Sequence, residues 1–169
     1  MPPADFVVRP ATVADLPAID AIFNREILKG VATWDSVPWT AEARRVWFDA
    51  HQRQGEAVFV AATPDGTVAG FSHLSFYSPR AAYWTTRTDS VYIDPAYQRR
   101  GVGRLLVTAV LEEARRTGAH LVLAGIDSEN AASIALHAGL GFAVMSRLPE
   151  AGRKFEAWRT LVQMGILLG

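Results

Sequence analysis

Hydrophobic residues in the first part of the chain recur at the spacing of amphipathic helices. After Thr12 they lie on one helical face at Leu16, Ile19, Ile22, Phe23 and Ile27. Thr12 and Asp15 have the spacing of a capping box that begins such a helix, and Gly30 can end it. A second helix is predicted from Thr40, with one apolar face formed by Ala43, Val46, Trp47 and Ala50.

Short apolar or alternating runs predict strands in the rest of the chain. The predicted strands span residues 6–8, 57–62, 68–76, 83–93, 121–126, 141–148 and 155–168. A hairpin turn at 64–66 joins the second and third strands, and residues 149–154 are predicted as a loop between the last two. Two further helices are predicted, from Gly101 to about Thr117 and from Asn130 to Gly139. The order β-α-α-β-β-β-α-β-α-β-β indicates an α/β fold, with helices on both faces of a mixed sheet.

The composition is that of an ordinary globular protein, and we expect a single domain spanning residues 1–169. The formal net charge is zero, so nucleic-acid binding has no global electrostatic support. The chain has no cysteine, which excludes disulfides, thiolate metal sites and cysteine nucleophiles. Its four histidines lack close ligand spacing, and we expect no metal site. Without a recognisable signal peptide or an apolar run of the ~18 residues that span a membrane, we expect a cytoplasmic protein.

A glycine-containing run stands between an apolar strand and an amphipathic helix and reads Gln98-Arg99-Arg100-Gly101-Val102-Gly103. Its glycines allow a sharp turn that leaves backbone N–H groups uncovered at a helix N-terminus, where a phosphate or pyrophosphate can bind. Arg99, Arg100 and Arg104 gather here, which fits a small anion better than a polyanion. A tight strand-to-helix turn without a ligand is the alternative interpretation. Dinucleotide and triphosphate loop patterns are absent, because Leu106 occupies the third glycine position and no Gly-Lys-Ser/Thr occurs.

This loop resembles the acetyl-CoA pyrophosphate loop of the GNAT N-acetyltransferases, whose pattern is Gln/Arg-x-x-Gly-x-Gly/Ala. Further segments make nearly the whole chain similar to the phosphinothricin and methionine sulfone/sulfoximine (L-amino-acid) acetyltransferase group. They are Arg9-Pro10-Ala11-Thr12 with Asp15, Thr33-Trp34-Asp35, Arg80-x-x-Tyr83, Asp89-Ser90-Val91-Tyr92-Ile93-x-Pro95, residues 124–133, Asn130…His137…Leu140-Gly141-Phe142 and Lys154-Phe155-x-x-Trp158. The resemblance implies the GNAT fold, with a mixed, mostly antiparallel sheet. It also implies acetyl transfer from acetyl-CoA to a small amine by direct attack, and a homodimer.

By the same resemblance, the acetyl-CoA pyrophosphate would bind the backbone of residues 98–103, beside Arg104. The pantetheine arm would pair like an added strand with the backbone along Val91, Tyr92 and Ile93. Asn130 and Ser133 would contact the pantetheine or the nucleotide end. Without the resemblance, the favoured interpretations are a helix cap for Asn130 and a small helix residue for Ser133.

The residue at the position of the family's catalytic base is unusual in this chain. Family members usually carry a glutamate on the long strand, and an ungapped match places Thr88 there, which cannot serve as a base at neutral pH. Asp89 follows it, but strand alternation directs this side chain to the opposite face unless a β-bulge turns it inward. Asp35, or His73 on the neighbouring strand, can act through water instead.

His137 is the candidate proton donor. It lies five residues before Phe142, where the resemblance implies the residue that protonates the leaving thiolate. An imidazole near its unperturbed pKa can donate that proton at neutral pH. A histidine that merely hydrogen-bonds to the backbone of a short helix is the alternative.

The amine substrate is expected to meet Trp34 and Tyr83 as pocket walls, with Arg80 binding a carboxylate. Trp47 and Trp158 are expected in the core. The resemblance favours an α-amino acid, or an analogue with a tetrahedral sulfur or phosphorus group, as the small-molecule substrate. A non-catalytic acyl-CoA-binding module and a protein N-acetyltransferase remain alternative functions.

Overall fold

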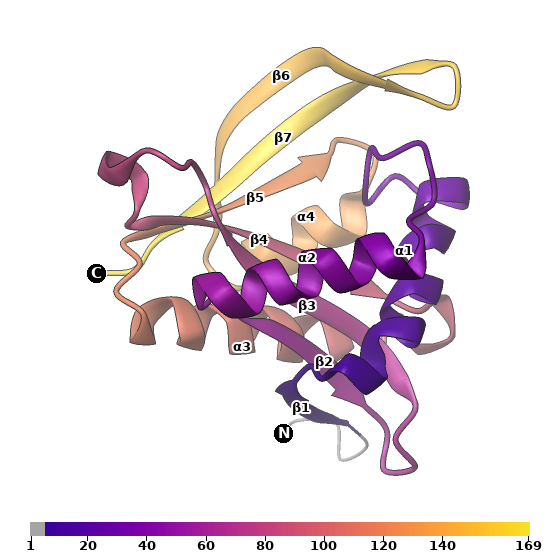
Figure 1. The fold of residues 1–169 in the computed structure, drawn as a ribbon. Coiled ribbons are helices and arrows are strands. Elements are labelled where there is room, and N and C mark those ends of the chain that lie inside the picture. The colour runs from indigo at the N-terminus through magenta and orange to yellow at the C-terminus, as the bar shows by residue number, and fades with distance from the viewer. Residues whose placement is uncertain (1–5) are drawn as a thin grey trace.

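The computed structural model describes residues 6–169, which form one seven-stranded sheet and four α-helices (Figure 1). The helices are α1 (Leu16–Lys29), α2 (Ala41–Gln54), α3 (Val102–Arg116) and α4 (Ala131–Ala138). The strands are β1 (Val7–Pro10), β2 (Val58–Ala62), β3 (Val68–Phe76), β4 (Thr86–Ile93), β5 (Leu121–Asp127), β6 (Ala143–Lys154) and β7 (Ala157–Leu167).

Across the sheet the strands lie in the order β1-β2-β3-β4-β5-β7-β6. Among these strands β4 and β5 are parallel neighbours, and all other neighbouring pairs are antiparallel. Figure 1 shows α1 and α2 in front of the sheet and α3 and α4 behind it. The predicted fold class and element order are therefore confirmed.

Strand β4 separates two apolar layers and sends alternate side chains to each. Tyr92 packs in the layer under α1 and α2, whereas Val91 and Ile93 pack with the residues of α3. The pairing of β3 with β4 has no register shift, so the alternation continues to the start of the strand. Thr88 therefore shares the face of Tyr92, and Asp89 shares the face of Val91.

The sheet opens between β4 and β5. These strands pair from Thr86↔Leu121 to Asp89↔Ala124 and then diverge. Beyond this point Ser90–Ile93 remain paired with β3, and Gly125–Asp127 remain paired with β7. The two facing edges thus present backbone N–H and C=O groups with no ladder partner across the opening, and such an edge can pair with an extended ligand.

The predicted loop at residues 149–154 is wrong, because these residues belong to β6. The hairpin turn is formed by Phe155 and Glu156, with φ of 51° and 62°. Proline is tolerated here because β6 is an edge strand, and a register shift between Leu148 and Gly152 accommodates Pro149.

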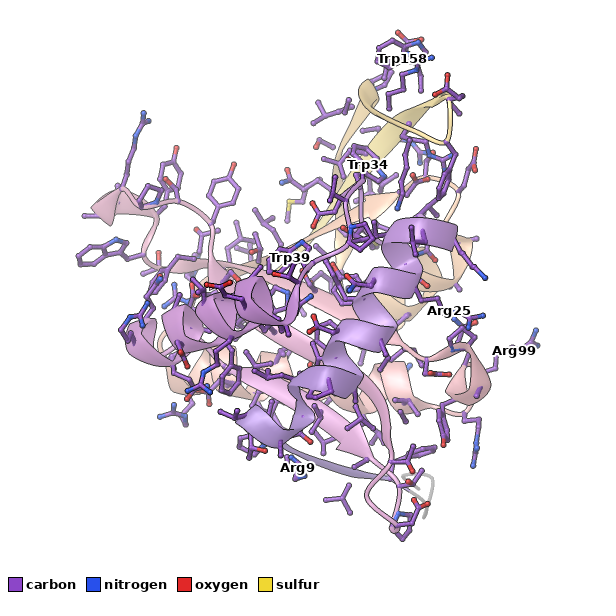
Figure 2. The ribbon with its side chains drawn as sticks, turned by 45° about the vertical axis from the view of Figure 1, so that its right-hand side comes forward. Arg9, Arg25, Trp34, Trp39, Arg99 and Trp158 are labelled. Atoms are coloured by element: carbon purple, nitrogen blue, oxygen red, sulfur yellow. The ribbon has the colours of Figure 1, made fainter. Side chains whose placement is uncertain are left out.

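Two further expectations need correction. The strand predicted from Tyr83 begins at Thr86, because Ala81–Tyr83 form a 3-10 turn. Trp158, expected in the core, is 62% exposed near the tip of the β6–β7 hairpin (Figure 2), whereas Trp47 packs against the α1–α2 layer as expected. None of the helices within residues 6–169 is long and apolar enough to cross a membrane.

Candidate active site

The loop before α3 leaves the start of that helix open. Arg99 and Gly101 have positive φ values of 61° and 83°, and Gly101 is the N-cap. No side chain caps the helix, and its first turn contains no acidic residue. The first N–H groups, from Val102 to Arg104, therefore have no partner within the helix, and they lie at the positive end of its dipole. This is the arrangement that binds a phosphate group.

Helix α4 packs closely against this helix start because residue 103 is glycine. A Cβ atom at Gly103 would lie 2.9 Å from Cδ2 of Leu136. Nη2 of Arg104 donates a hydrogen bond of 3.2 Å to the carbonyl of Gly139, just after α4. The two helices thus form one continuous wall beside the opening between β4 and β5.

A cavity of about 660 Å³ occupies this opening. Twelve of the residues proposed from the sequence line it: Asp89, Val91, Tyr92, Ile93, Gln98, Arg99, Gly101, Gly103, Arg104, Asn130, Ser133 and His137. Six others do not line it: Trp34, Arg80, Tyr83, Thr88, Arg100 and Val102. Val102 is buried in the core, and the guanidinium of Arg100 lies over the rings of Phe6 and Tyr97. Asn130 is also the predicted cap of α4, because its side chain accepts a hydrogen bond from the N–H of Ser133.

His137 and Asp89 meet at the closed end of the opening, where β4 and β5 part. Nε2 of His137 lies 3.3 Å from Oδ2 of Asp89, and the two side chains are 2% and 0% exposed. The ring of Phe142 packs edge-on against the imidazole, with the centroids 5.0 Å apart. Oδ1 of Asp89 is buried and has no hydrogen-bond partner among the described residues. No β-bulge is needed for this contact, because ordinary alternation directs Asp89 towards α4.

Hydrogen-bond geometry places a proton between these two side chains. Nδ1 of His137 lies 2.7 Å from the carbonyl oxygen of Ser133, which can only accept, so Nδ1 donates. In the neutral imidazole Nε2 would then be an acceptor that faces another acceptor on Asp89. Burial disfavours the charged imidazole. The hydrogen bond and charge of Asp89, with the Ser133 carbonyl, outweigh burial and raise the pKa of His137 above its ordinary value.

Thr88 lies on the other face of β4 and does not touch this pair. Its hydroxyl donates to the carbonyl of Ser75 across the sheet, at 3.4 Å. The Thr88 side chain therefore only links β4 to β3 by a hydrogen bond. Its hydroxyl cannot act as a base at neutral pH.

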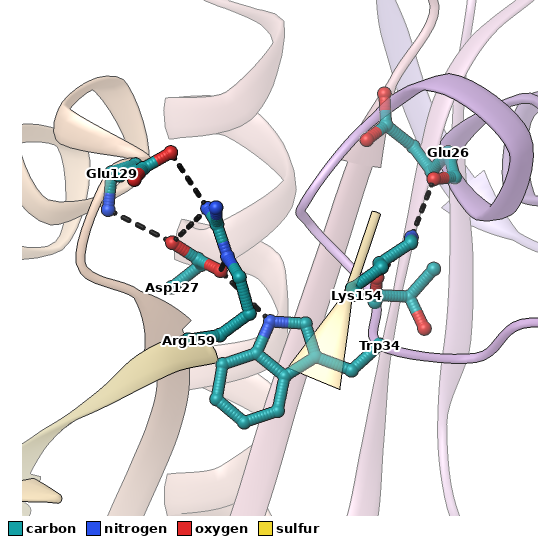
Figure 3. A network of polar contacts seen from close by, with 7 residues as sticks. Glu26, Trp34, Asp127, Glu129, Lys154 and Arg159 are labelled. Atoms are coloured by element: carbon teal, nitrogen blue, oxygen red, sulfur yellow. Dashed lines mark hydrogen bonds and ion pairs between the residues drawn. The ribbon is translucent and has the colours of Figure 1, made fainter. Parts of the chain in front are cut away.

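A polar network joins the β6–β7 hairpin to the loop between α1 and α2 (Figure 3). Nε and Nη2 of Arg159 bind both carboxylate oxygens of Asp127, at 2.7 and 2.8 Å. The indole N–H of Trp34 donates to the same carboxylate at 2.9 Å. Burial alone would raise the pKa of Asp127, but the hydrogen bonds from Arg159, the Glu129 N–H and Trp34 hold it below its ordinary value. Trp34 therefore lies beside the cavity without lining it.

Lys154 fastens the same loop from the end of β6. Its Nζ donates to the carbonyls of Glu26 and Thr33, at 3.0 and 2.6 Å. Gly152 allows the Trp34 ring to pack directly against β6, because a Cβ atom at residue 152 would lie 2.5 Å from that ring. Figure 2 shows Trp34 under the hairpin and Trp158 pointing away from the body of the protein.

Arg80 and Tyr83 lie on the exposed segment between β3 and β4. Arg80 is exposed and precedes the 3-10 turn, and the ring of Tyr83 packs against that of Tyr77 with centroids 5.4 Å apart. The structure does not bring them into contact with Trp34, so the predicted substrate pocket is not assembled from these three residues alone.

Comparison with known proteins decides the family. The protein-family model described as "Acetyltransferase (GNAT) family" matches residues 23–142 of this chain. The chain belongs to the GNAT acetyltransferase family. It is 38% identical over 161 residues to the L-methionine sulfoximine/L-methionine sulfone acetyltransferase of Pseudomonas paraeruginosa, covering 95% of this chain and 94% of that protein. It is 32% identical over 154 residues to the phosphinothricin N-acetyltransferase of Streptomyces coelicolor, covering 90% of each.

A solved acetyltransferase from Salmonella typhimurium, described with its cofactor acetyl-CoA, matches this acetyltransferase with a TM-score of 0.94. The two are 37% identical, and the match covers 98% of this chain and 95% of the other. The GNAT fold and acetyl-CoA as the cosubstrate, both expected from the motifs, are therefore confirmed.

The acetyltransferase fits acetyl-CoA by two independent features of its own. The uncapped start of α3 offers backbone donors to a pyrophosphate. The unpaired edge of Ser90–Ile93 offers N–H and C=O groups to the amide-containing pantetheine arm. Both features line the same cavity, so one extended molecule can reach from the helix start to the His137–Asp89 pair.

Replacing Gly103 by valine is expected to weaken acetyl-CoA binding. The added side chain would push Leu136 and α4 away from the helix start, and such overpacking costs about 1–3 kcal/mol. If this cost falls on the bound state, the Kd for acetyl-CoA rises about tenfold, because ~1.4 kcal/mol corresponds to a factor of ten. Isothermal titration calorimetry checks this. The matched control is Gly118→Ala, a turn glycine after α3 and outside the cavity lining, which should leave the Kd unchanged.

Replacing Asp89 by asparagine is expected to lower the pKa of His137. The lost carboxylate no longer offsets burial, and the asparagine amide can donate to Nε2 of the neutral imidazole. In the wild type the pKa of His137 is raised by folding, so the His137–Asp89 pair stabilises the folded protein. This contribution is complete at pH values below the pKa of histidine in the unfolded chain, near 6.5. That contribution is lost as the pH rises through the folded pKa. Urea titrations should show the stability gap between wild type and variant closing with rising pH. A gap that widens would contradict this assignment.

Sequence reasoning did not assign roles to Asp127, Arg159 or Lys154, although Asp127 and Lys154 lie in segments that carry the family resemblance. Arg159 and Asp127 are 32 residues apart, and their contact exists only because β5 and β7 are neighbours in the sheet. The signal that the sequence does offer is a single charged residue in each of two otherwise apolar strands, Asp127 in β5 and Arg159 in β7.

Proposed function

We propose that this protein, as a single acetyltransferase domain, transfers the acetyl group of acetyl-CoA to the primary amine of a small amino-acid-like molecule. Amino-acid analogues with a tetrahedral sulfur or phosphorus group, such as methionine sulfone, methionine sulfoximine and phosphinothricin, are the proposed substrates. The names of the relatives support this class, since two of them are named for these compounds.

The observation that carries the enzymatic proposal is the buried pair of His137 and Asp89. Transfer by direct attack releases a thiolate, which needs a proton. The hydrogen-bond geometry gives His137 a proton on Nε2, because Asp89 and the Ser133 carbonyl stabilise its charged form and raise its pKa despite burial. A buried pair that holds a proton at the end of the cavity fits the catalysis of acetyl transfer, a reaction that a module that only binds acyl-CoA does not perform.

The residues divide the remaining tasks. The N–H groups of Val102–Arg104 bind the pyrophosphate, and the backbone of Val91 and Ile93 holds the pantetheine arm in register. This register brings the thioester sulfur to His137, which donates its Nε2 proton to that sulfur as the C–S bond breaks. Asp89 keeps the imidazole oriented and charged before the transfer.

Recognition of the amine is assigned to the loops around the cavity. Trp34 is held beside it by Asp127, and Arg80 is placed on the exposed segment between β3 and β4. We propose that Arg80 binds the substrate carboxylate when that segment closes over the bound amino acid, with Tyr83 covering its side chain. Trp34 forms the opposite wall.

The experiment that tests this function measures thiol release from acetyl-CoA across an amine panel. The panel contains methionine sulfone, methionine sulfoximine, phosphinothricin, the common L-amino acids and a short peptide with a free N-terminus. We expect selective turnover of the sulfur or phosphorus analogues. Silence with all of them, while acetyl-CoA binds tightly, would favour the non-catalytic module. Turnover of the peptide alone would favour a protein N-acetyltransferase.

We also propose that two copies associate through β6 and β7. The hairpin stands away from the body of the protein in Figure 1, and β6 has a free edge. The large apolar side chains exposed on this hairpin are Val144, Met145, Leu148, Phe155, Trp158 and Leu167. A patch of this kind is typical of an interface. Sedimentation equilibrium should give a dimer for the wild type and a monomer for Met145→Glu. Cytoplasmic location stays a prediction, which cell fractionation tests.

A further inference from the structure

A second group of polar residues, buried or half-buried, lies on the face of the sheet opposite His137. It consists of His51 on α2, His73 and Ser75 on β3, and Glu56 after α2. Oγ of Ser75 lies between the two imidazoles, 3.1 Å from Nε2 of His51 and 3.2 Å from Nδ1 of His73. Oε2 of Glu56 lies 3.6 Å from Nε2 of His51. Four groups that can carry or stabilise a proton thus form one connected chain.

The donors and acceptors of this chain can be ordered. Nδ1 of His51 lies 3.0 Å from the carbonyl of Trp47, which can only accept, so Nδ1 donates. Nε2 of neutral His51 then accepts from the hydroxyl of Ser75, and that oxygen in turn accepts from Nδ1–H of His73. Nε2 of His73 is left with a free lone pair.

His73 does not itself line the cavity, but it lies next to a residue that does. It is the cross-strand partner of Ser90, which lines the cavity, while Ser75 is the partner of Thr88. Paired residues of an antiparallel sheet share a face, so the His73 ring lies on the face of Thr88, Ser90 and Tyr92. Burial raises the pKa of Tyr92 to about 12, which removes this phenol as a base at neutral pH.

A proton taken up by His73 would not remain there. Burial lowers the pKa of His73 to about 3, and the positive charge of Arg44 adds to the effect. The far end of the chain is more favourable, because Glu56 is buried beside His51 and its other oxygen accepts from the Phe76 N–H. Charge therefore moves from a position without a counterion to one with a carboxylate.

We propose that His73, Ser75 and His51 form a proton relay that removes the amine proton of the substrate, in place of the base that Thr88 cannot provide. The inference rests on the proposed function. As the amine nitrogen bonds to the acetyl carbon, its N–H proton passes to Nε2 of His73. Nδ1–H of His73 passes to Oγ of Ser75, and the Ser75 hydroxyl proton passes to Nε2 of His51. On the other face the C–S bond breaks, and the sulfur takes the proton of His137.

The relay fixes the imidazole tautomers of the resting protein, which can be observed without turnover. The chain holds four histidines, so ¹⁵N-edited NMR can resolve each imidazole. We expect both His51 and His73 in the Nδ1–H form at neutral pH, with Ser75→Ala releasing His73 from that form. Finding His73 in the Nε2–H form in the wild type would overturn the relay, whatever the substrate proves to be.

Kinetics supply the second test, with Ser75→Ala as the minimal break in the chain. We expect kcat to fall roughly 10²-fold, the lower end of general-base effects, with unchanged affinity for acetyl-CoA. An alkoxyamine analogue, whose nitrogen is far less basic, should show a much smaller loss because it needs no strong base. His73→Gln should behave in the same way. His120→Gln, an exposed histidine outside the relay, is the matched control.

The kinetic outcomes distinguish a proton relay from a purely structural role of these side chains. Equal losses on basic and weakly basic amines would mean that Ser75 merely anchors α2, and full activity of Ser75→Ala would remove it from the reaction. Glu26 also lines the cavity, so a Glu26→Gln variant that alone abolishes turnover would assign the base there instead. If the wild type acetylates no amine, the proposed function is refuted. The NMR measurement of the imidazole tautomers tests the relay independently of that result.

Discussion

Replacing His137 by glutamine is expected to reduce kcat by roughly 10²–10⁴, the range for loss of a general acid. The glutamine amide can still reach Asp89, but it has no proton to give to a thiolate at neutral pH. Acetyl-CoA should bind as before, because the pyrophosphate and pantetheine contacts come from backbone groups of β4 and α3. Steady-state kinetics and calorimetry measure the two quantities separately.

The control for this variant is the exposed His120→Gln. It changes the same residue type outside the cavity and should keep wild-type kcat. A His137→Gln enzyme with wild-type kcat would remove His137 from the chemistry. The pair with Asp89 would then be only a structural contact between α4 and β4.

Replacing Asp127 by alanine is expected to have the largest effect on stability. Its carboxylate is fully buried and binds Arg159 through both oxygens and Trp34 through one. Removing it leaves a buried guanidinium without its main partner, although Glu129 still binds Arg159 at the surface. We expect a loss of roughly 3 kcal/mol in the free energy of unfolding, the lower end for breaking a buried ion pair.

The same variant should raise KM for the amine substrate more than the Kd for acetyl-CoA, because it releases Trp34 and leaves the N-terminus of α3 intact. Urea denaturation gives the stability, and kinetics at saturating acetyl-CoA give KM. Arg153→Ala is the matched control, since the exposed Arg153–Glu156 ion pair on the same hairpin should contribute little. Equal effects of the two variants would show that the network in Figure 3 does not hold the loop.

The features that could be predicted from the sequence depend on local chain geometry. The loop from Gln98 to Gly103 is recognisable because glycine spacing and the absence of an N-terminal acid are properties of adjacent residues. The orientation of Asp89 follows from strand alternation alone, and the structure has it on the face opposite Thr88. Asn130 as the cap of α4 is a local feature of the same kind.

The features that the sequence did not reveal depend on packing between distant segments. The bridge from His51 to His73 requires α2 to lie across β3, and no local pattern contains both residues. The sequence does not predict the full length of β6, because a proline such as Pro149 usually ends a strand. An edge strand like β6 tolerates it. Trp158 was expected in the core from its residue type, but its strand continues past the body of the protein.

Transfer of a labelled acetyl group tests the proposed chemistry at the bond that it forms. Acetyl-CoA carrying ¹³C in the acetyl carbonyl is incubated with methionine sulfone, and the product is followed by NMR and mass spectrometry. We predict ¹³C in an amide bond to the substrate nitrogen, formed by the wild type and strongly slowed in His137→Gln. Label that remains in acetyl-CoA, or is released as acetate, with every amine of the panel would contradict acetyl transfer to an amine.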